Sequence, residues 1–332
     1  MIVLAGVPAS ASPNSAKQAV SSPGDPSGIG MPQGGPDVLV NSTYYDRALN
    51  SSDWGNTPDG LVYKSCIYQI PSGAEVDSTH NEIIEASGAT LPAPPCPYSR
   101  LIKPSAATAT KQSGIATPAA VNPSDAEWLI WATYVTSSPL NYMATGYAAP
   151  YPPTSPGATD YLFSSFQNSA RNSILQPVIG FGPTTGENNQ QIGGNYLWMA
   201  SYYVWGSNVA VGDLIQVSTN NTIHGYMSAA NCGSGGGDCT WTILTQDNST
   251  GTESQLVVGS SPAYTVFDGA VLESTGGGCN KLFSNAHGVF RGLLGITNAR
   301  VLTPSWSVYP SQPQCSAYIT GDSANLDILW TP

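Results

Sequence analysis

Two short apolar stretches of the chain each carry one side chain that could do chemistry. Gln176 lies within the stretch NSILQPVIGFG (172–182) and Glu273 within YTVFDGAVLES (264–274). Both stretches are typical of β-strands, in which alternate side chains share a face, so Gln176 should share a face with Val178 and Glu273 with Val271. A carboxylate can activate a water, and a carboxamide on a facing or adjacent strand can donate to an oxyanion. Gln176 and Glu273 are therefore the candidate catalytic pair.

Other familiar catalytic motifs are absent from the sequence. It contains no G-x-S-x-G, no Asp-Thr-Gly or Asp-Ser-Gly, no H-E-x-x-H and no phosphate-binding loop. Asp268-Gly269-Ala270 is only weakly similar to the motif of aspartic proteases. The three histidines are far apart and no C-x-x-C occurs, so we expect neither a metal ion nor any other cofactor.

The elements that must position the pair are predicted to be short strands. Gly and Pro number 35 and 27, and charged residues make up only 9% of the chain, against about 25% in an average soluble protein. From residue 126 onward about eleven strand-like segments are separated by Gly, Pro, Asn and Ser turns, with no convincing amphipathic helix. This spacing predicts an all-β fold, an antiparallel β-sandwich or jelly roll of the concanavalin-like kind.

The predicted domain organisation places this sandwich in the second part of the chain. Residues 1–12 resemble the end of a signal peptide, with a small-x-small cleavage site at residues 9–11. Residues 13–125 read as a propeptide-like region, with an extended or disordered stretch over 21–37 and a linker over 104–125. Residues 126–332 would then form the β-sandwich domain.

Charge and cysteine content restrict partners and compartment. The formal net charge is −11, so nucleic acid is an unsuitable partner. With only ten Lys and Arg, the protein also gains little net positive charge when its carboxylates are protonated in acid. No apolar run is long enough to span a membrane. Six cysteines indicate disulfides and a secreted, extracellular protein, expected to be monomeric. Chain order suggests the pairs Cys66–Cys96, Cys232–Cys239 and Cys279–Cys315, although six cysteines allow fifteen pairings.

The order of motifs resembles the glutamic peptidases, or eqolisins, over about residues 140–305. ATGYAAPYPP, SILQPVIGFG, YLWMASYYVW, VAVGDLIQVST and DGAVLES stand in the order of that family's strand motifs. The resemblance implies a β-sandwich that hydrolyses polypeptides in acid and is made as a zymogen. It also implies that Glu273 is the general base and Gln176 the oxyanion donor. Trp198 matches the tryptophan of the family's aromatic strand, and aromatic residues such as Trp198 and Tyr202 would line the cleft.

The sequence departs from the family pattern beside the pair. Ala200 stands where the family has Glu, and residues 164–167 stand where it has an Asp-rich segment. The alternative hypothesis is a non-catalytic, lectin-like β-sandwich that binds carbohydrate on an aromatic face. A glycosidase would need a second carboxylate flanking the bond, and the motifs offer Glu273 no obvious partner.

Overall fold

The computed structural model describes residues 38–40, 42–102, 128–186, 190–276, 278–309 and 314–331. These described residues belong to one compact unit. The predicted signal-peptide remnant (1–12), the predicted linker (104–125) and the boundary near residue 125 lie outside the described residues. The division into a propeptide-like region and a sandwich domain therefore stays a prediction.

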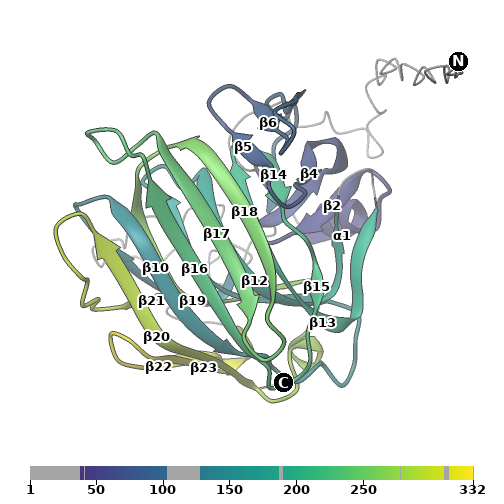
Figure 1. The fold of residues 1–332 in the computed structure, drawn as a ribbon. Coiled ribbons are helices and arrows are strands. Elements are labelled where there is room, and N and C mark those ends of the chain that lie inside the picture. The colour runs from purple at the N-terminus through teal and green to yellow at the C-terminus, as the bar shows by residue number, and fades with distance from the viewer. Residues whose placement is uncertain are drawn as a thin grey trace, which may run out of the picture. The chain divides into compact units, whose positions relative to one another are not determined.

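Most of the described chain is β-structure (Figure 1). The N-terminal elements are β1 (Val38–Leu39), α1 (Ser42–Leu49), β2 (Trp54–Thr57), β3 (Gly60–Tyr63), η1 (Lys64–Cys66), β4 (Ile67–Gln69), β5 (Glu75–Asp77), β6 (Glu82–Ile84), β7 (Thr90–Pro92) and β8 (Leu101–Ile102). The next strands are β9 (Trp128–Val135), β10 (Leu140–Ala148), β11 (Thr159–Asn168), β12 (Ser173–Thr185), β13 (Gln191–Trp205), β14 (Asn208–Val211), β15 (Ile215–Gln216) and β16 (Thr222–Ala230). The remaining elements are β17 (Cys239–Asp247), β18 (Thr252–Ser261), β19 (Tyr264–Thr275), η5 (Cys279–Lys281), β20 (His287–Thr297), β21 (Ser307–Tyr309), η6 (Gln314–Ser316), β22 (Tyr318–Gly321) and β23 (Leu326–Leu329).

Two large sheets form the sandwich. One has the order β22-β23-β20-β10-β16-β17-β18-β5-β6-β7, and the other has the order β21-β9-β19-β11-β12-β13-β14-β4, with β15 also paired to β13. In Figure 1, β10, β16, β17 and β18 run side by side, and β5 and β6 continue the sheet beyond β18. Apolar residues from the facing sides, such as Met143, Ile179 and Ile243, build the main core between them. The predicted all-β sandwich is confirmed.

The sandwich is mixed rather than purely antiparallel. The parallel pairs among the described strands all involve the N-terminal segment: β4 with β14, β5 with β18, and β1 with β8. β4 and β5 each extend a different large sheet at its edge. The propeptide-like region of the sequence analysis thus contributes strands to both sheets.

After residue 126, four described strands do not coincide with any of the predicted segments, namely β10, β14, β16 and β21. β10 (LNYMATGYA) and β16 (TIHGYMSAA) both contain Ala and Gly, which are depleted in strands. Their buried and part-exposed positions alternate nonetheless, because one side of each strand packs into the main core.

The predicted extended or disordered stretch, residues 21–37, lies outside the described residues. The described residues between 38 and 60 show little periodicity in the sequence, yet they form regular structure. α1 and β2 form there, because Tyr45, Ala48 and Trp54 bury their side chains. An eight-residue helix is too short to be stable alone, so tertiary burial accounts for α1. In the part of the chain that the structure describes, the helices are too short to cross a membrane.

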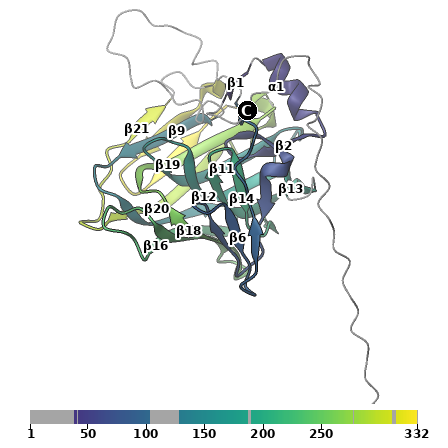
Figure 2. The ribbon, with the colours of Figure 1, turned by 90° about the horizontal axis from the view of Figure 1, so that it is seen from above.

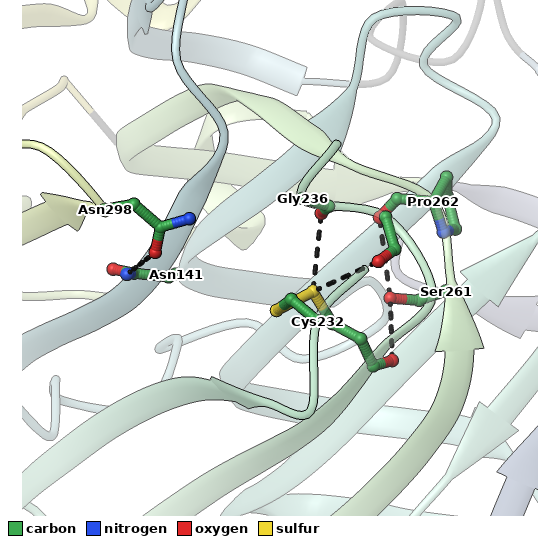
Figure 3. The surroundings of a disulfide bond; sticks show 8 residues. Asn141, Cys232, Gly236, Ser261, Pro262 and Asn298 are labelled. Carbon is green, nitrogen blue, oxygen red and sulfur yellow. Dashed lines mark hydrogen bonds between the residues drawn. A yellow bond between two sulfur atoms is a disulfide. The ribbon is translucent and has the colours of Figure 1, made fainter. Parts of the chain in front are cut away.

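The three predicted disulfides, Cys66–Cys96, Cys232–Cys239 and Cys279–Cys315, are all present. The second closes a glycine-rich turn between β16 and β17 (Figure 3). The Ser261 hydroxyl on β18 donates to the Cys239 carbonyl at 3.3 Å and ties this turn to the neighbouring strand. Three disulfides favour an oxidising compartment.

A small third sheet, in the order β1-β8-β3-β2, lies against the outer face of the β9–β14 sheet. The Asn56 side chain donates to the Thr275 hydroxyl at 2.8 Å, and the Thr184 hydroxyl donates to the Asn56 carbonyl at 2.8 Å. In both views, α1 and β2 lie beside β13 (Figures 1 and 2). This outer face carries the candidate catalytic pair.

Candidate active site

Gln176 lies in the middle of β12, between β11 and β13, and faces Tyr202 across the β12–β13 ladder. It is fully buried. Among the described residues, neither its amide nitrogen nor its amide oxygen has a hydrogen-bond partner. A buried polar group left in this state costs about 1–3 kcal/mol, so such groups are rare and are often functional.

Glu273 lies near the end of β19, between Trp128 on β9 and Tyr161 on β11. It is also fully buried. The backbone N–H of Asp59, from the N-terminal segment, donates to its Oε1 at 3.0 Å. A fully buried carboxylate bound by a backbone amide is an unusual arrangement for a strand residue.

Both side chains point to the outer face of the sheet. Tyr161 pairs with Glu273 on one side and with Gly180 on the other, and Gly180 is four residues from Gln176 on β12. The two residues are therefore two strands and four residues apart, with β11 between them, rather than on adjacent strands. Burial raises the pKa of Tyr202, the residue opposite Gln176, against a hydrogen bond with Thr184, and the negative charge of Glu273 raises it further.

The other predicted cleft residues, Trp198 and Tyr202, share this face and are fully buried. Their rings are 6.4 Å apart. The Trp198 indole N–H donates to the Gly182 carbonyl at 2.9 Å, at the point where β12 bends and Gly182 has φ +96°. The Trp198 ring lies over Gly180, where a Cβ atom would overlap it. Gly180 therefore fixes the position of the aromatic wall.

Gly180→Ala is expected to displace the Trp198 ring and to lower the free energy of unfolding by about 1–3 kcal/mol, the usual cost of an overpacked site. Chemical denaturation measures this change. Gly235→Ala is the matched control, because no atom lies within 4 Å of its added methyl group. Equal stability of the two variants would show that Trp198 can move without cost.

A second buried carboxyl on the same face was missed by the sequence analysis. Asp268 lies on β19 and accepts hydrogen bonds from the Ser165 hydroxyl at 2.9 Å and the Gln167 amide at 2.8 Å. The β11–β12 register places Ser165 opposite Gln176. Burial raises the pKa of Asp268 against the opposing effects of Arg171 and of these hydrogen bonds. The only signal in the sequence was an acidic residue inside an apolar strand.

A β-bulge brings Asp268 to this face. Simple alternation would point Asp268 and Glu273 to opposite sides of β19. The register shifts between Asp268 and Ala270, so Asp268 pairs with Ser165 while Glu273 pairs with Tyr161. Bulges re-aim side chains in this way and are common beside functional sites.

The positions at which the sequence departs from the family pattern lie close to the buried polar side chains of this face. Ala200 pairs with Val178 on the same face and presents no polar group. Ser165 and Gln167, which stand in the segment where the family is Asp-rich, bind the carboxyl of Asp268 from the neighbouring strand. The acidic group at this point of the face thus comes from β19 instead of β11.

The turn at Pro58–Asp59 joins β2 to β3 and reaches the Glu273 carboxylate. Asp59 has φ +81°, and the Thr57 hydroxyl closes the turn by donating to the Gly60 carbonyl at 2.9 Å. The Arg100 guanidinium donates to the Asp59 carboxylate at 3.2 Å, and both side chains are fully buried. A buried ion pair therefore fixes this turn to the residue that precedes β8, within the small sheet.

Among the described residues, no group of three or more His, Cys, Asp or Glu side chains could hold a metal ion. What the arrangement offers is a carboxylate, a carboxamide and an aromatic wall, under a turn of the chain's own N-terminal segment. Acid–base chemistry and oxyanion stabilisation need only such groups.

The fold is similar to those of solved glutamic peptidases. Scytalido-glutamic peptidase with a peptide-based transition state analog has a TM-score of 0.46 and 12% sequence identity, covering 62% of this chain and 99% of that chain. The same peptidase with a transition state analog inhibitor gives 0.47 and 10%, with the same coverage. Aspergilloglutamic peptidase from Aspergillus niger gives 0.37 and 11%, covering 52% and 99%. No protein-family model and no curated protein matches the chain.

Proposed function

We propose that this protein is a secreted endopeptidase that works in acid and is made as an inactive precursor. Glu273 is the general base that takes a proton from the attacking water and returns one to the leaving amine. The Gln176 amide donates to the oxygen of the tetrahedral intermediate. Trp198 and Tyr202 contact the substrate. The mechanism requires the Gln176 and Glu273 side chains to meet on one scissile carbonyl.

The observation that carries this proposal is the Gln176 amide, buried without a hydrogen-bond partner among the described residues on the face that also bears Glu273. A donor kept unsatisfied in a dry site is available to a developing oxyanion, and one such donor is typically worth about 3 kcal/mol. Because Gln does not titrate, the donor persists at every pH.

The contact at Glu273 supports a polypeptide as the substrate and a precursor as the form described. The group on the carboxylate is itself a peptide N–H, that of Asp59. The face therefore accommodates a polypeptide backbone. While the turn stays in place, a substrate cannot reach Glu273.

The buried carboxyls support an acid working range. Burial raises the pKa of Asp160 to about 7, against a hydrogen bond from Ser274, and it also raises the pKa of Asp268. Both groups are uncharged in acid, so the native state bears no penalty for burying them there. The scarcity of Lys and Arg also limits charge repulsion at low pH.

Acid incubation of the purified protein tests the proposal. At pH values from about 2 to 7, intact mass is followed over time, together with digestion of a denatured protein substrate. Wild type should lose N-terminal residues and digest the substrate in acid. Glu273→Gln should slow both reactions by about 10²–10⁴-fold, and Gln176→Ala by about 10²–10³-fold.

Glu253→Gln and Gln216→Ala are matched controls, because both side chains are exposed strand residues of the same types. They should behave like wild type. Wild-type proteolytic activity in Glu273→Gln, or no proteolysis by wild type at any pH, would contradict the peptidase proposal. The lectin-like alternative would then lead, and a glycan-binding screen would decide on it.

A further inference from the structure

The N-terminal segment has two parts that bind the sandwich in different ways. The lid, defined as residues 54–63 and 99–102, contains β2, β3, β8 and the Asp59 turn. The clasp, defined as residues 66–96, is the loop closed by the Cys66–Cys96 disulfide and contains β4 to β7. The lid consists of two sequence segments, one before the clasp and one after it.

The lid covers the site without entering the main core. Its buried apolar side chains, Leu61, Val62, Tyr63, Leu101 and Ile102, are separate from the main core among the described residues. Its strands pair with one another and with β1, not with a strand of either large sheet. Specific contacts hold it on the sandwich instead, from Asn56 to Thr275 and from the Asp59 amide to Glu273. The buried Arg100–Asp59 pair joins the two parts of the lid to each other.

The clasp is built into the sandwich. β4 pairs with β14 at the edge of one large sheet, and β5 pairs with β18 at the edge of the other. The Ile70 amide donates to the Val211 carbonyl at 2.8 Å, and the Thr79 hydroxyl donates to the Ser260 carbonyl at 2.7 Å. Five clasp side chains are members of the main core: Ile70, Ala74, Val76, Ile83 and Ala93.

Loss of the clasp would therefore expose two sheet edges and remove apolar contacts from the main core. Unpaired edges invite association with other chains, and lost core side chains destabilise the fold. Loss of the lid would uncover the outer face and leave the core between the large sheets intact.

We propose that the two parts have different fates: the lid is released to open the site, whereas the clasp is a permanent edge partner of both sheets. The release rests on the proposed function, but the structural role of the clasp does not. The mature protein then contains a segment from the N-terminal region, held on β14 and β18 by strand pairing and core packing.

Two valines provide a matched test in the full-length chain. Val62 in the lid and Val76 in the clasp are both fully buried strand residues. Val76→Asp should lower the Tm of the whole protein by about 10 °C or more, because it places a charge in the main core. Val62→Asp should speed amide exchange in the lid by about 10-fold or more while the exchange of β14 and β18 stays at the wild-type rate.

Hydrogen exchange of the wild-type chain provides a second readout that needs no folded variant. The clasp amides of β4 and β5 should be as protected as those of β14 and β18, and the lid amides less so. A Val76→Asp protein with wild-type Tm, or a clasp that exchanges before the lid, would overturn the proposal.

Native mass spectrometry of acid-processed protein tests the fate of the clasp directly. We expect the active body to carry a peptide that contains Cys66 and Cys96 joined by their disulfide. An active body that lacks this peptide would overturn the proposal. Absence of processing at any pH counts against the proposed function instead, and the two stability experiments still decide the role of the clasp.

Discussion

Arg100→Met is expected to destabilise the lid that covers Glu273. The change removes the Arg100 guanidinium from the buried Asp59 carboxylate, and breaking a buried ion pair from one side costs about 3–5 kcal/mol. That cost corresponds to an increase of about two to four orders of magnitude in the opening equilibrium of the lid. Hydrogen exchange of the lid amides at neutral pH measures it, and the proposed enzyme should also process itself faster in acid.

Two further variants make this result interpretable. Arg47→Met removes an exposed arginine from α1 and should change stability by less than about 0.5 kcal/mol. Adding Asp59→Asn to Arg100→Met should restore part of the lid protection, because Asn is uncharged and tolerates a positive φ. If lid exchange is unchanged in Arg100→Met, the ion pair does not hold the lid.

Asp160→Asn is expected to stabilise the protein at neutral and alkaline pH. The folded pKa of Asp160 is about 7, raised from 3.8 by burial against a Ser274 hydrogen bond. Below about pH 3 the carboxyl is largely protonated in both states, so it has little effect there. As pH rises from about 4 to 7, the unfolded state ionises first and the native state loses stability, on the order of 4 kcal/mol in total.

Asn does not titrate, so this part of the pH dependence should disappear in the variant. The Ser274 hydroxyl, 2.6 Å from Oδ1 of Asp160, keeps an acceptor in the Asn side chain. Denaturation at pH 4 and pH 8 checks the prediction, with exposed Asp213→Asn as control. If the stability of Asp160→Asn falls between pH 4 and pH 8 by as much as that of wild type, other groups cause the fall and the prediction is wrong.

The direction of this effect connects the fold with the proposed acid range. Asp160 and Asp268 both destabilise the native state when they ionise, so the protein is expected to be most stable where they are neutral. A protein that works at neutral pH would gain nothing from burying two such carboxyls. The same logic makes the lid important for the proposed function, since the proposed precursor would have to stay closed until it reaches acid.

Local properties of the sequence were sufficient to predict the architecture and the candidate pair. Strand alternation and turn composition predicted the β-sandwich, and chain order predicted the three disulfides. The same alternation predicted that Gln176 shares a face with Val178, and Glu273 with Val271, as the register shows. These features depend on neighbours within one strand or one turn. The catalytic roles of Gln176 and Glu273 stay a prediction.

Tertiary structure alone decided which strands meet and what covers the pair. The bulge after Asp268 turns its carboxyl to the Gln176 face, against simple alternation. The parallel pairing of β4 and β5 makes residues 66–96 part of both sheets. The Asp59 turn reaches Glu273 across 214 positions of sequence. Register, edge pairing and such long-range contacts are set by the packing of whole sheets, which no short segment of sequence specifies.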